Sequence, residues 1–167
     1  MAKEIINRVA NSKLITIDLE DYYPQGERVR LDISQWLAGG FILRELDFRA
    51  SLAAYNWEQH QNQMVAMYCS TEAILPAWTY SLVSLLLAPV ATKNIVGDLD
   101  QLESIIYSEI IQNLDLGYCE GKPCIIKGCA NKPIPQNAYV LLSQKLLPIA
   151  KSVMYGEACS FVQLAKR

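Results

Sequence analysis

Met64-Val65-Ala66-Met67-Tyr68 is an apolar run that ends in Cys69, and a long apolar stretch with helical character follows it. The run Pro123-Cys124-Ile125-Ile126-Lys127 leads through Gly128 to Cys129 and shows the same order before another helical stretch. Short apolar runs of this kind are typical of strands buried in a parallel sheet. Strands that alternate with helices pair in parallel through right-handed crossovers. The two stretches therefore predict an α/β fold with Cys69 and Cys129 at one carboxyl edge of a sheet.

Helix-capping residues and the spacing of apolar residues predict the other helices and strands. Leu14–Leu19 indicates a strand that adds at an edge of the sheet, and Lys93–Gly97 indicates a short strand. Asp98 with Gln101 is a capping box that opens an amphipathic helix. A last helix is predicted from Pro135 to about Met154, with a kink at Pro148. We expect a single domain over residues 1–167, with helices on both faces of a mostly parallel sheet and no internal repeat.

One stretch tests whether the chain is soluble. From Ala73 to Thr92 there are 20 residues without a formal charge, which is the length of a membrane span. Pro76 and Pro89 leave an uninterrupted helix of only 13 residues. Such a helix is about 20 Å long and does not cross a hydrocarbon core of about 30 Å. We therefore predict a buried helix and no membrane partner.

Composition narrows the class of protein. Hydrophobic residues make up 51% and charged residues 19%, and the formal net charge is −2. This balance excludes a disordered chain and a basic surface for nucleic acid, and the sparse charge favours a homo-oligomer. The first residues lack the apolar region of a signal peptide, so we expect a cytoplasmic location in which the five cysteines are reduced. No Gly-rich phosphate loop is present, so no nucleotide cofactor is expected.

The spacing of the cysteines indicates which of them can belong to one site. Cys119, Cys124 and Cys129 are spaced like metal ligands. A strand over 123–127 would hold Cys124 and Cys129 about 16 Å apart, whereas thiolates on one zinc are about 4 Å apart. Cys124 is therefore predicted to be a core residue and Cys119 to be incidental. Cys159 follows the last predicted helix, whose end simple topology places at the opposite edge of the sheet.

Three polar residues near these cysteines are candidates for catalysis. Lys127 could lower the pKa of a Cys129 thiolate, and Glu72 could carry protons from the start of the helix after Cys69. A lysine that reaches solvent is at least as ordinary an interpretation of Lys127, and for Glu72 we favour a carboxylate that caps the helix over a catalytic role. His60 lies in a polar segment and is predicted to be a solvated surface histidine.

Four blocks of the sequence resemble a bacterial domain-of-unknown-function family, the one numbered 2480. They are Phe41-Ile42-Leu43-Arg44-Glu45 through Asp47-Phe48-Arg49, Tyr68-Cys69-Ser70-Thr71-Glu72-Ala73-Ile74-Leu75-Pro76-Ala77-Trp78, Ile126-Lys127-Gly128-Cys129, and Met154-Tyr155-Gly156-Glu157-Ala158-Cys159-Ser160. Cys69, Cys129 and Cys159 lie within these blocks, so the resemblance brings Cys159 back as a site residue. Genes of family members lie near iron–sulfur cluster assembly genes, so the resemblance also implies assembly proteins as partners.

Three functions stay open from the sequence. In the first, which we favour, Cys69, Cys129 and Cys159 bind zinc, iron or an iron–sulfur group in a metal- or sulfur-handling protein. In the second, Cys129 is the nucleophile of a thiol enzyme, with Lys127 as activator and Glu72 or His60 as proton carrier. In the third, the chain is a non-catalytic dimeric interaction protein.

Overall fold

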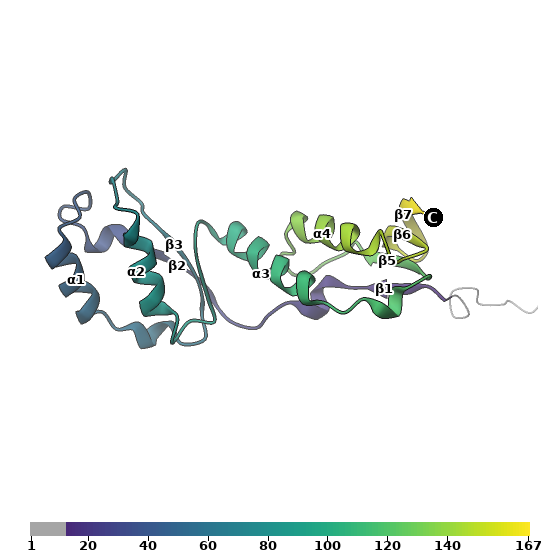
Figure 1. Ribbon diagram of the computed structural model, residues 1–167, viewed down its shortest axis with the longest axis horizontal. Coiled ribbons are helices and arrows are strands. Elements are labelled where there is room, and N and C mark those ends of the chain that lie inside the picture. The colour runs from purple at the N-terminus through teal and green to yellow at the C-terminus, as the bar shows by residue number, and fades with distance from the viewer. Residues whose placement is uncertain (1–12) are drawn as a thin grey trace, which may run out of the picture. The chain divides into compact units, whose positions relative to one another are not determined.

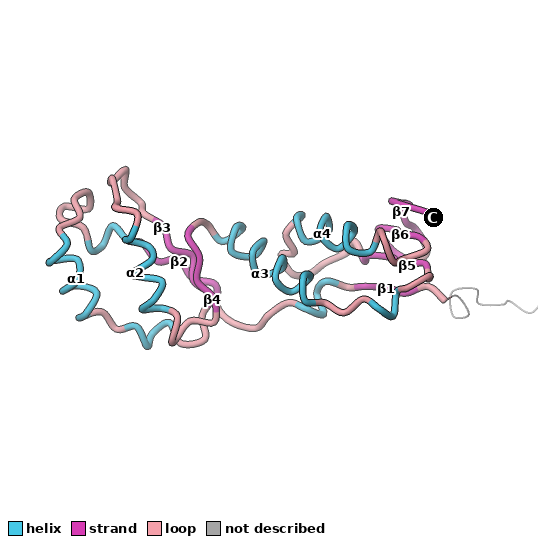
Figure 2. Tube along the Cα trace, viewed as in Figure 1, coloured by secondary structure: helices cyan, strands magenta, loops and turns pink. Residues whose placement is uncertain are grey.

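The structure of this protein, a computed structural model, describes residues 13–167. These residues form four α-helices and seven strands (Figures 1 and 2). In chain order they are β1 Ile15–Ile17, β2 Arg28–Asp32, α1 Glu45–Ala54, β3 Met64–Tyr68, α2 Trp78–Leu87, β4 Lys93–Val96, α3 Leu99–Asn113, β5 Pro123–Lys127, α4 Gln136–Leu146, β6 Ser152–Glu157 and β7 Ser160–Lys166.

The strands form two sheets, with the orders β1-β5-β6-β7 and β2-β3-β4. Every neighbouring pair is parallel except β6 with β7. The prediction of an α/β fold with mostly parallel pairing is therefore confirmed, and β1 lies at an edge of its sheet as expected. The expectation that Cys69 and Cys129 end strands of one sheet is wrong, because β3 and β5 belong to different sheets.

Contacts divide the chain into two compact units. The central unit comprises Pro24–Ile106, and the terminal unit comprises the described residues up to Tyr23 together with Tyr107–Arg167. The prediction of a single domain stays a prediction.

The central unit has helices on both faces of its sheet. Buried residues of α1 and α2, such as Phe48 and Val83, pack with Val65 and Met67 of β3. Arg28 pairs with Met64 in the sheet, so it lies on the face opposite Val65, and its guanidinium donates to Glu103 of α3. The Arg28–Glu103 ion pair therefore holds α3 against the second face of the central sheet.

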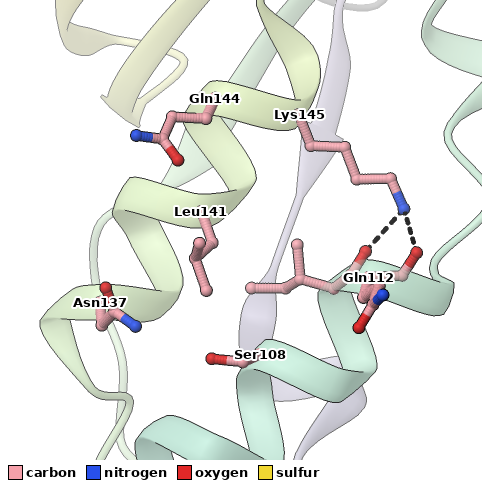
Figure 3. A pocket seen from close by; sticks show the side chains of 7 residues that line it. Ser108, Gln112, Asn137, Leu141, Gln144 and Lys145 are labelled. Atoms are coloured by element: carbon pink, nitrogen blue, oxygen red, sulfur yellow. Dashed lines mark hydrogen bonds between the residues drawn. The ribbon is translucent and has the colours of Figure 1, made fainter.

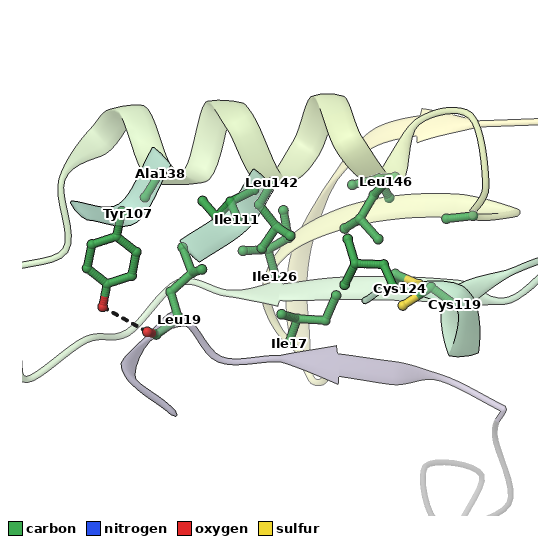
Figure 4. Packing of buried hydrophobic residues seen from close by; sticks show 13 residues of the cluster. Ile17, Leu19, Tyr107, Ile111, Cys119, Cys124, Ile126, Ala138, Leu142 and Leu146 are labelled. Atoms are coloured by element: carbon green, nitrogen blue, oxygen red, sulfur yellow. Dashed lines mark hydrogen bonds between the residues drawn. The ribbon is translucent and has the colours of Figure 1, made fainter. Parts of the chain in front are cut away.

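The terminal unit has its core between one face of the sheet and two helices (Figure 4). Leu142 and Leu146 of α4 and Ile111 of α3 pack on Ile126 of β5 and Ile17 of β1. All five side chains are almost fully buried. The Tyr107 hydroxyl donates to the carbonyl of Leu19 at 2.9 Å, which satisfies the buried phenol.

Two helix predictions need correction. The helix predicted to reach Met154 ends at Leu146, and Ser152 begins β6. Pro148 follows the end of α4, as expected of a residue that cannot continue a helix. α2 begins at Trp78, so Glu72 lies in the preceding loop rather than at the start of the helix.

The uncharged segment does form a helix, but α2 buries only one side. Thr79, Val83 and Leu87 are buried, whereas Leu85 is 71% exposed. Within residues 13–167, no helix has the length and apolar character that crossing a membrane would require.

The structure shows an internal repeat that we did not expect from the sequence. Adding 59 to the numbers of β3, Met64–Tyr68, gives those of β5, Pro123–Lys127, and the same shift takes Lys93 at the start of β4 to Ser152 at the start of β6. It also takes α1 onto the last ten residues of α3. Eight residues are identical in equivalent positions of the two copies: Pro76 and Pro135, Tyr80 and Tyr139, Leu82 and Leu141, Ser84 and Ser143, Leu87 and Leu146, Pro89 and Pro148, Ala91 and Ala150, Gly97 and Gly156.

Backbone hydrogen bonds follow the same shift. The N–H of Asn62 donates to the Val90 carbonyl at 2.9 Å, and the N–H of Gly121 donates to the Ile149 carbonyl at 2.9 Å. Asn62 has φ +60°, and Gly121 has φ +66°. Because only Gly, and less readily Asn or Asp, adopts this left-handed conformation, both copies require it at the same turn. We therefore infer that residues 45–98 and 104–157 are two copies of one module.

The repeat predicts which residue Gly121 can accept. Gly121→Asn should cost little free energy of unfolding, because Asn62 already holds the equivalent conformation. Gly121→Val should cost about 1–2 kcal/mol, since a β-branched residue is strained there. A Cβ at Gly121 would have no atom within 4 Å, so steric clash does not contribute to the loss of stability in either variant. Chemical denaturation of both variants checks the difference, and equal losses would contradict the equivalence.

Candidate functional site

Two of the five cysteines are core residues. Cys119 and Cys124 are fully buried in the terminal unit and lie close together (Figure 4). Burial, together with the neighbouring Cys119 thiol, raises the pKa of Cys124 to about 12. The repeat places Val65 at the position of Cys124 and His60 at that of Cys119, and both are buried. The prediction that Cys124 is a core residue is confirmed.

His60 is buried rather than solvated, so the surface prediction was wrong. It ends the 3-10 turn Trp57–His60, and the residue is 7% exposed. Nε2 lies 2.9 Å from the Tyr55 hydroxyl, and Nδ1 lies 2.9 Å from Oε1 of Gln63. With both ring nitrogens bonded inside the central unit, His60 fills a core position of the repeat.

Cys69 follows β3 in the central unit and is half-buried. Its sulfur lies 3.3 Å from the Thr71 hydroxyl, and that hydroxyl donates to the Gly40 carbonyl at 2.6 Å. These contacts tie the loop after β3 to the loop around Gly40. Glu72, in the same loop, is exposed.

Cys129 and Cys159 lie at one edge of the terminal sheet. β5 and β6 are parallel neighbours, with Lys127 opposite Gly156, and the N–H of Gly128 donates to the Gly156 carbonyl at 3.3 Å. Cys129 follows Gly128 directly, and Cys159 lies in the turn between the paired residues Glu157 and Ser160. Both cysteines are exposed. The topology argument against Cys159 was wrong because the chain after α4 returns along the sheet as β6 before it reaches Cys159.

An ion pair lies at the same edge. Lys127 Nζ donates to Asp18 Oδ2 at 2.7 Å, and Asp18 follows β1, which pairs with β5. Partial burial opposes ionisation of Asp18, but hydrogen bonds from Lys127 and from the Glu20 N–H outweigh it and lower the pKa of Asp18. Hydrogen bonding to Asp18 raises the pKa of Lys127. The ammonium of Lys127 is therefore engaged by a carboxylate.

Aromatic and acidic side chains that we did not predict complete this edge. Tyr139 of α4 packs against Tyr155 of β6 with ring centres 5.5 Å apart, and burial raises the pKa of Tyr139, with Tyr155 and Asp18 adding to the effect. The Glu20 carboxylate accepts hydrogen bonds from the N–H groups of Asn131 and Lys132 in the loop after β5. The signal that could have revealed Asp18 and Glu20 is their place at the end of the predicted strand Leu14–Leu19, with Asp18 in its last two residues and Glu20 directly after it.

We call this set the thiol edge: Asp18, Glu20, Lys127, Cys129, Tyr139, Tyr155 and Cys159. The equivalent edge of the central unit keeps two of its features. Asp32 accepts from the Ser34 N–H at 2.9 Å, as Asp18 does from that of Glu20, and Tyr80 is equivalent to Tyr139. Ser70 takes the position of Cys129 and Tyr68 that of Lys127. The central unit therefore folds without a thiol at the position of Cys129.

A groove lies between α3 and α4 in the terminal unit (Figure 3). Its volume is about 520 Å³, and Ile111 and Leu141 form part of its floor. Lys145 at one end donates to the carbonyls of Ile111 and Gln112, at 2.6 and 2.9 Å. Lys145 therefore caps the end of α3, where a cation is favoured by the helix dipole, and the groove offers no reactive group.

Comparison with known proteins bears on the family alone. No curated protein and no solved structure matches the chain. The model of the family described as "Protein of unknown function (DUF2480)" matches residues 3–167, which include all four blocks of the resemblance and both copies of the repeat. Because the match covers almost the whole chain, the protein belongs to this family, DUF2480.

Proposed function

We propose that the chain binds a soft metal ion at the thiol edge and passes it on, with Cys129 and Cys159 as its ligands. The observation that carries the proposal is the position of two exposed thiols beyond neighbouring parallel strands. Open α/β sheets bind their ligands at this edge. Cys119 and Cys124 are buried side chains of the core and do not take part.

The number of protein ligands at the thiol edge favours a metal ion that is bound transiently over one that is bound permanently. Structural zinc sites have four protein ligands, and catalytic ones have three. Among residues 13–167, no three His, Cys, Asp or Glu side chains are grouped to hold a metal ion. Two thiolates leave positions for ligands from a donor or an acceptor, as transfer requires. Soft thiolates suit zinc, copper(I) and the iron of iron–sulfur clusters.

Delivery of iron to cluster assembly proteins is one form of this function, and the family resemblance implied it. The proposal uses a smaller set than the three cysteines predicted from the sequence. Cys69 ends a strand of the other sheet, and its sulfur contacts Thr71. The metal-handling function therefore rests on Cys129 and Cys159.

A thiol enzyme with Cys129 as nucleophile is the second candidate, favoured by the exposure of Cys129 and the nearby Tyr139. The assumed activator is engaged, however, because Lys127 donates to Asp18. Lys127→Met should therefore leave the alkylation rate of Cys129 unchanged between pH 6 and 9. A marked fall in that rate would support the enzyme instead.

Cobalt(II) binding tests the metal proposal, because thiolate ligands give cobalt an intense charge-transfer absorption. The full-length protein should show this band on titration, and Cys129→Ser and Cys159→Ser should each abolish most of it. Each removes one of two ligands, so affinity should fall at least tenfold, the scale on which even indirect ligand partners act.

Matched cysteine variants serve as controls. Cys124→Val should bind cobalt normally and fold well, since Val65 holds the equivalent position. Cys69→Ser should also keep the band. Loss of the band in Cys69→Ser would restore the three-cysteine set, and an unchanged band in Cys159→Ser would end the proposal.

The Lys127–Asp18 pair makes a prediction about pH. A lowered pKa means that Asp18 stabilises the fold above its unfolded pKa of about 3.9 and loses this effect as the pH falls through the folded value. The raised pKa of Lys127 stabilises the fold below about pH 10.4 and is lost above it. Asp18→Asn should thus lower the free energy of unfolding at pH 7 and converge with the wild type at low pH. Urea denaturation at pH 7 and pH 3 measures this, and a constant difference would refute it.

A further inference from the structure

β7 differs from every other exposed sheet edge of the described residues. β1 has three residues and β4 has four, and β2 carries Arg28 and Arg30. Short strands and charged side chains are the usual protection of an edge against pairing with another chain. β7 has seven residues, contains neither Pro nor Gly, and carries its first charge at Lys166. The pairing of β7 with β6 shifts register between Val153 and Met154, so Leu164 is an extra residue of β7. A bulge also protects an edge, but this one lies near the carboxyl end of the strand and leaves Ser160–Gln163 as a regular, uncharged edge.

The exposed apolar residues of the terminal sheet are concentrated on this strand. Phe161 is 49% exposed, Val162 64% and Leu164 50%. Hydrophobic side chains on a free edge gain from being covered, and the outward N–H and C=O groups gain from a strand partner.

The repeat shows that β7 is not demanded by the module. Gly97 and Gly156 are equivalent and have φ values of +145° and +129°. After Gly97 the chain enters α3, whereas after Gly156 it turns at Cys159 into β7. The two copies therefore diverge at this point, and only the terminal one gains an apolar edge strand.

We propose that β7 pairs with β7 of a second copy of this chain, antiparallel about a two-fold axis. Charge favours this occupant and this direction. Glu157 ends β6 at the β6–β7 turn and Lys166 ends β7, so antiparallel pairing brings the acidic turn of each copy toward the basic end of β7 in the other copy. A two-fold axis makes the contact self-complementary and closed. The terminal sheets of two copies then form one continuous sheet.

Mass measurement of the full chain by light scattering, with charge variants, tests the pairing. The wild type should have twice the mass of one chain. Val162→Lys sets like charges near the axis and should give a monomer that folds normally, because Val162 is mostly exposed. Ile74→Lys, at a 94% exposed position of the central unit, should leave the dimer intact. Mixing Val162→Lys with Val162→Glu should restore it through opposite charges.

A monomeric wild type at the highest soluble concentration would overturn the proposal and leave the edge to another occupant. A dimer that survives in Val162→Lys, or one that is lost in Ile74→Lys, would overturn it as well, since either result places the interface elsewhere. Circular dichroism of each variant confirms that the fold is kept.

Discussion

The parallel pairing of β5 with β6 is the constraint on which the thiol edge depends. In a parallel pair, both carboxyl ends reach the same side of the sheet, and the α4 crossover makes this pairing possible. The register with Lys127 opposite Gly156 then sets Cys129 beside the turn that holds Cys159. Gly156 has to be glycine, because a Cβ would lie 2.6 Å from the Ser160 carbonyl oxygen. A shift of register would separate the two thiols.

Comparison of the two copies distinguishes the residues that the fold requires from the residues that only the site uses. Both units keep a capping aspartate and a tyrosine at the carboxyl edge of the sheet: Asp32 and Tyr80 in the central unit, Asp18 and Tyr139 in the terminal unit. The terminal unit adds Lys127, Cys129 and Cys159 at this edge, where the central unit has Tyr68 and Ser70 in the places of Lys127 and Cys129. Because the central copy folds with Ser70 in the place of Cys129, the thiol is not a requirement of packing. Differences between two copies of one module therefore point to function more directly than the presence of a cysteine does.

Much of the fold could be predicted from the sequence, and the failures have physical causes. β3 and β5 were predicted with their bounds because continuous apolar runs are strong signals, and the Asp98–Gln101 capping box forms with hydrogen bonds of 2.8 and 2.9 Å. β6 was not predicted because α4 and β6 are both apolar, so Pro148 was interpreted as a kink within one helix rather than as a residue beyond its end. The repeat was missed because its identities fall between Pro76 and Gly97 of the first copy, while the other positions keep only their burial. Two sheets instead of one cannot be derived from the alternation of strands and helices, which is the same in both cases.

X-ray absorption at the edge of a bound soft metal tests the central claim most directly, because it counts sulfur ligands without reference to activity. The account predicts two sulfur neighbours for one ion on the full-length protein, at about 2.3 Å if the ion is zinc. Both should persist in Cys69→Ser and Cys124→Val, and one should be lost in Cys129→Ser and in Cys159→Ser. A shell of nitrogen and oxygen alone, or a sulfur count that Cys159→Ser leaves unchanged, would contradict the thiol edge as the site.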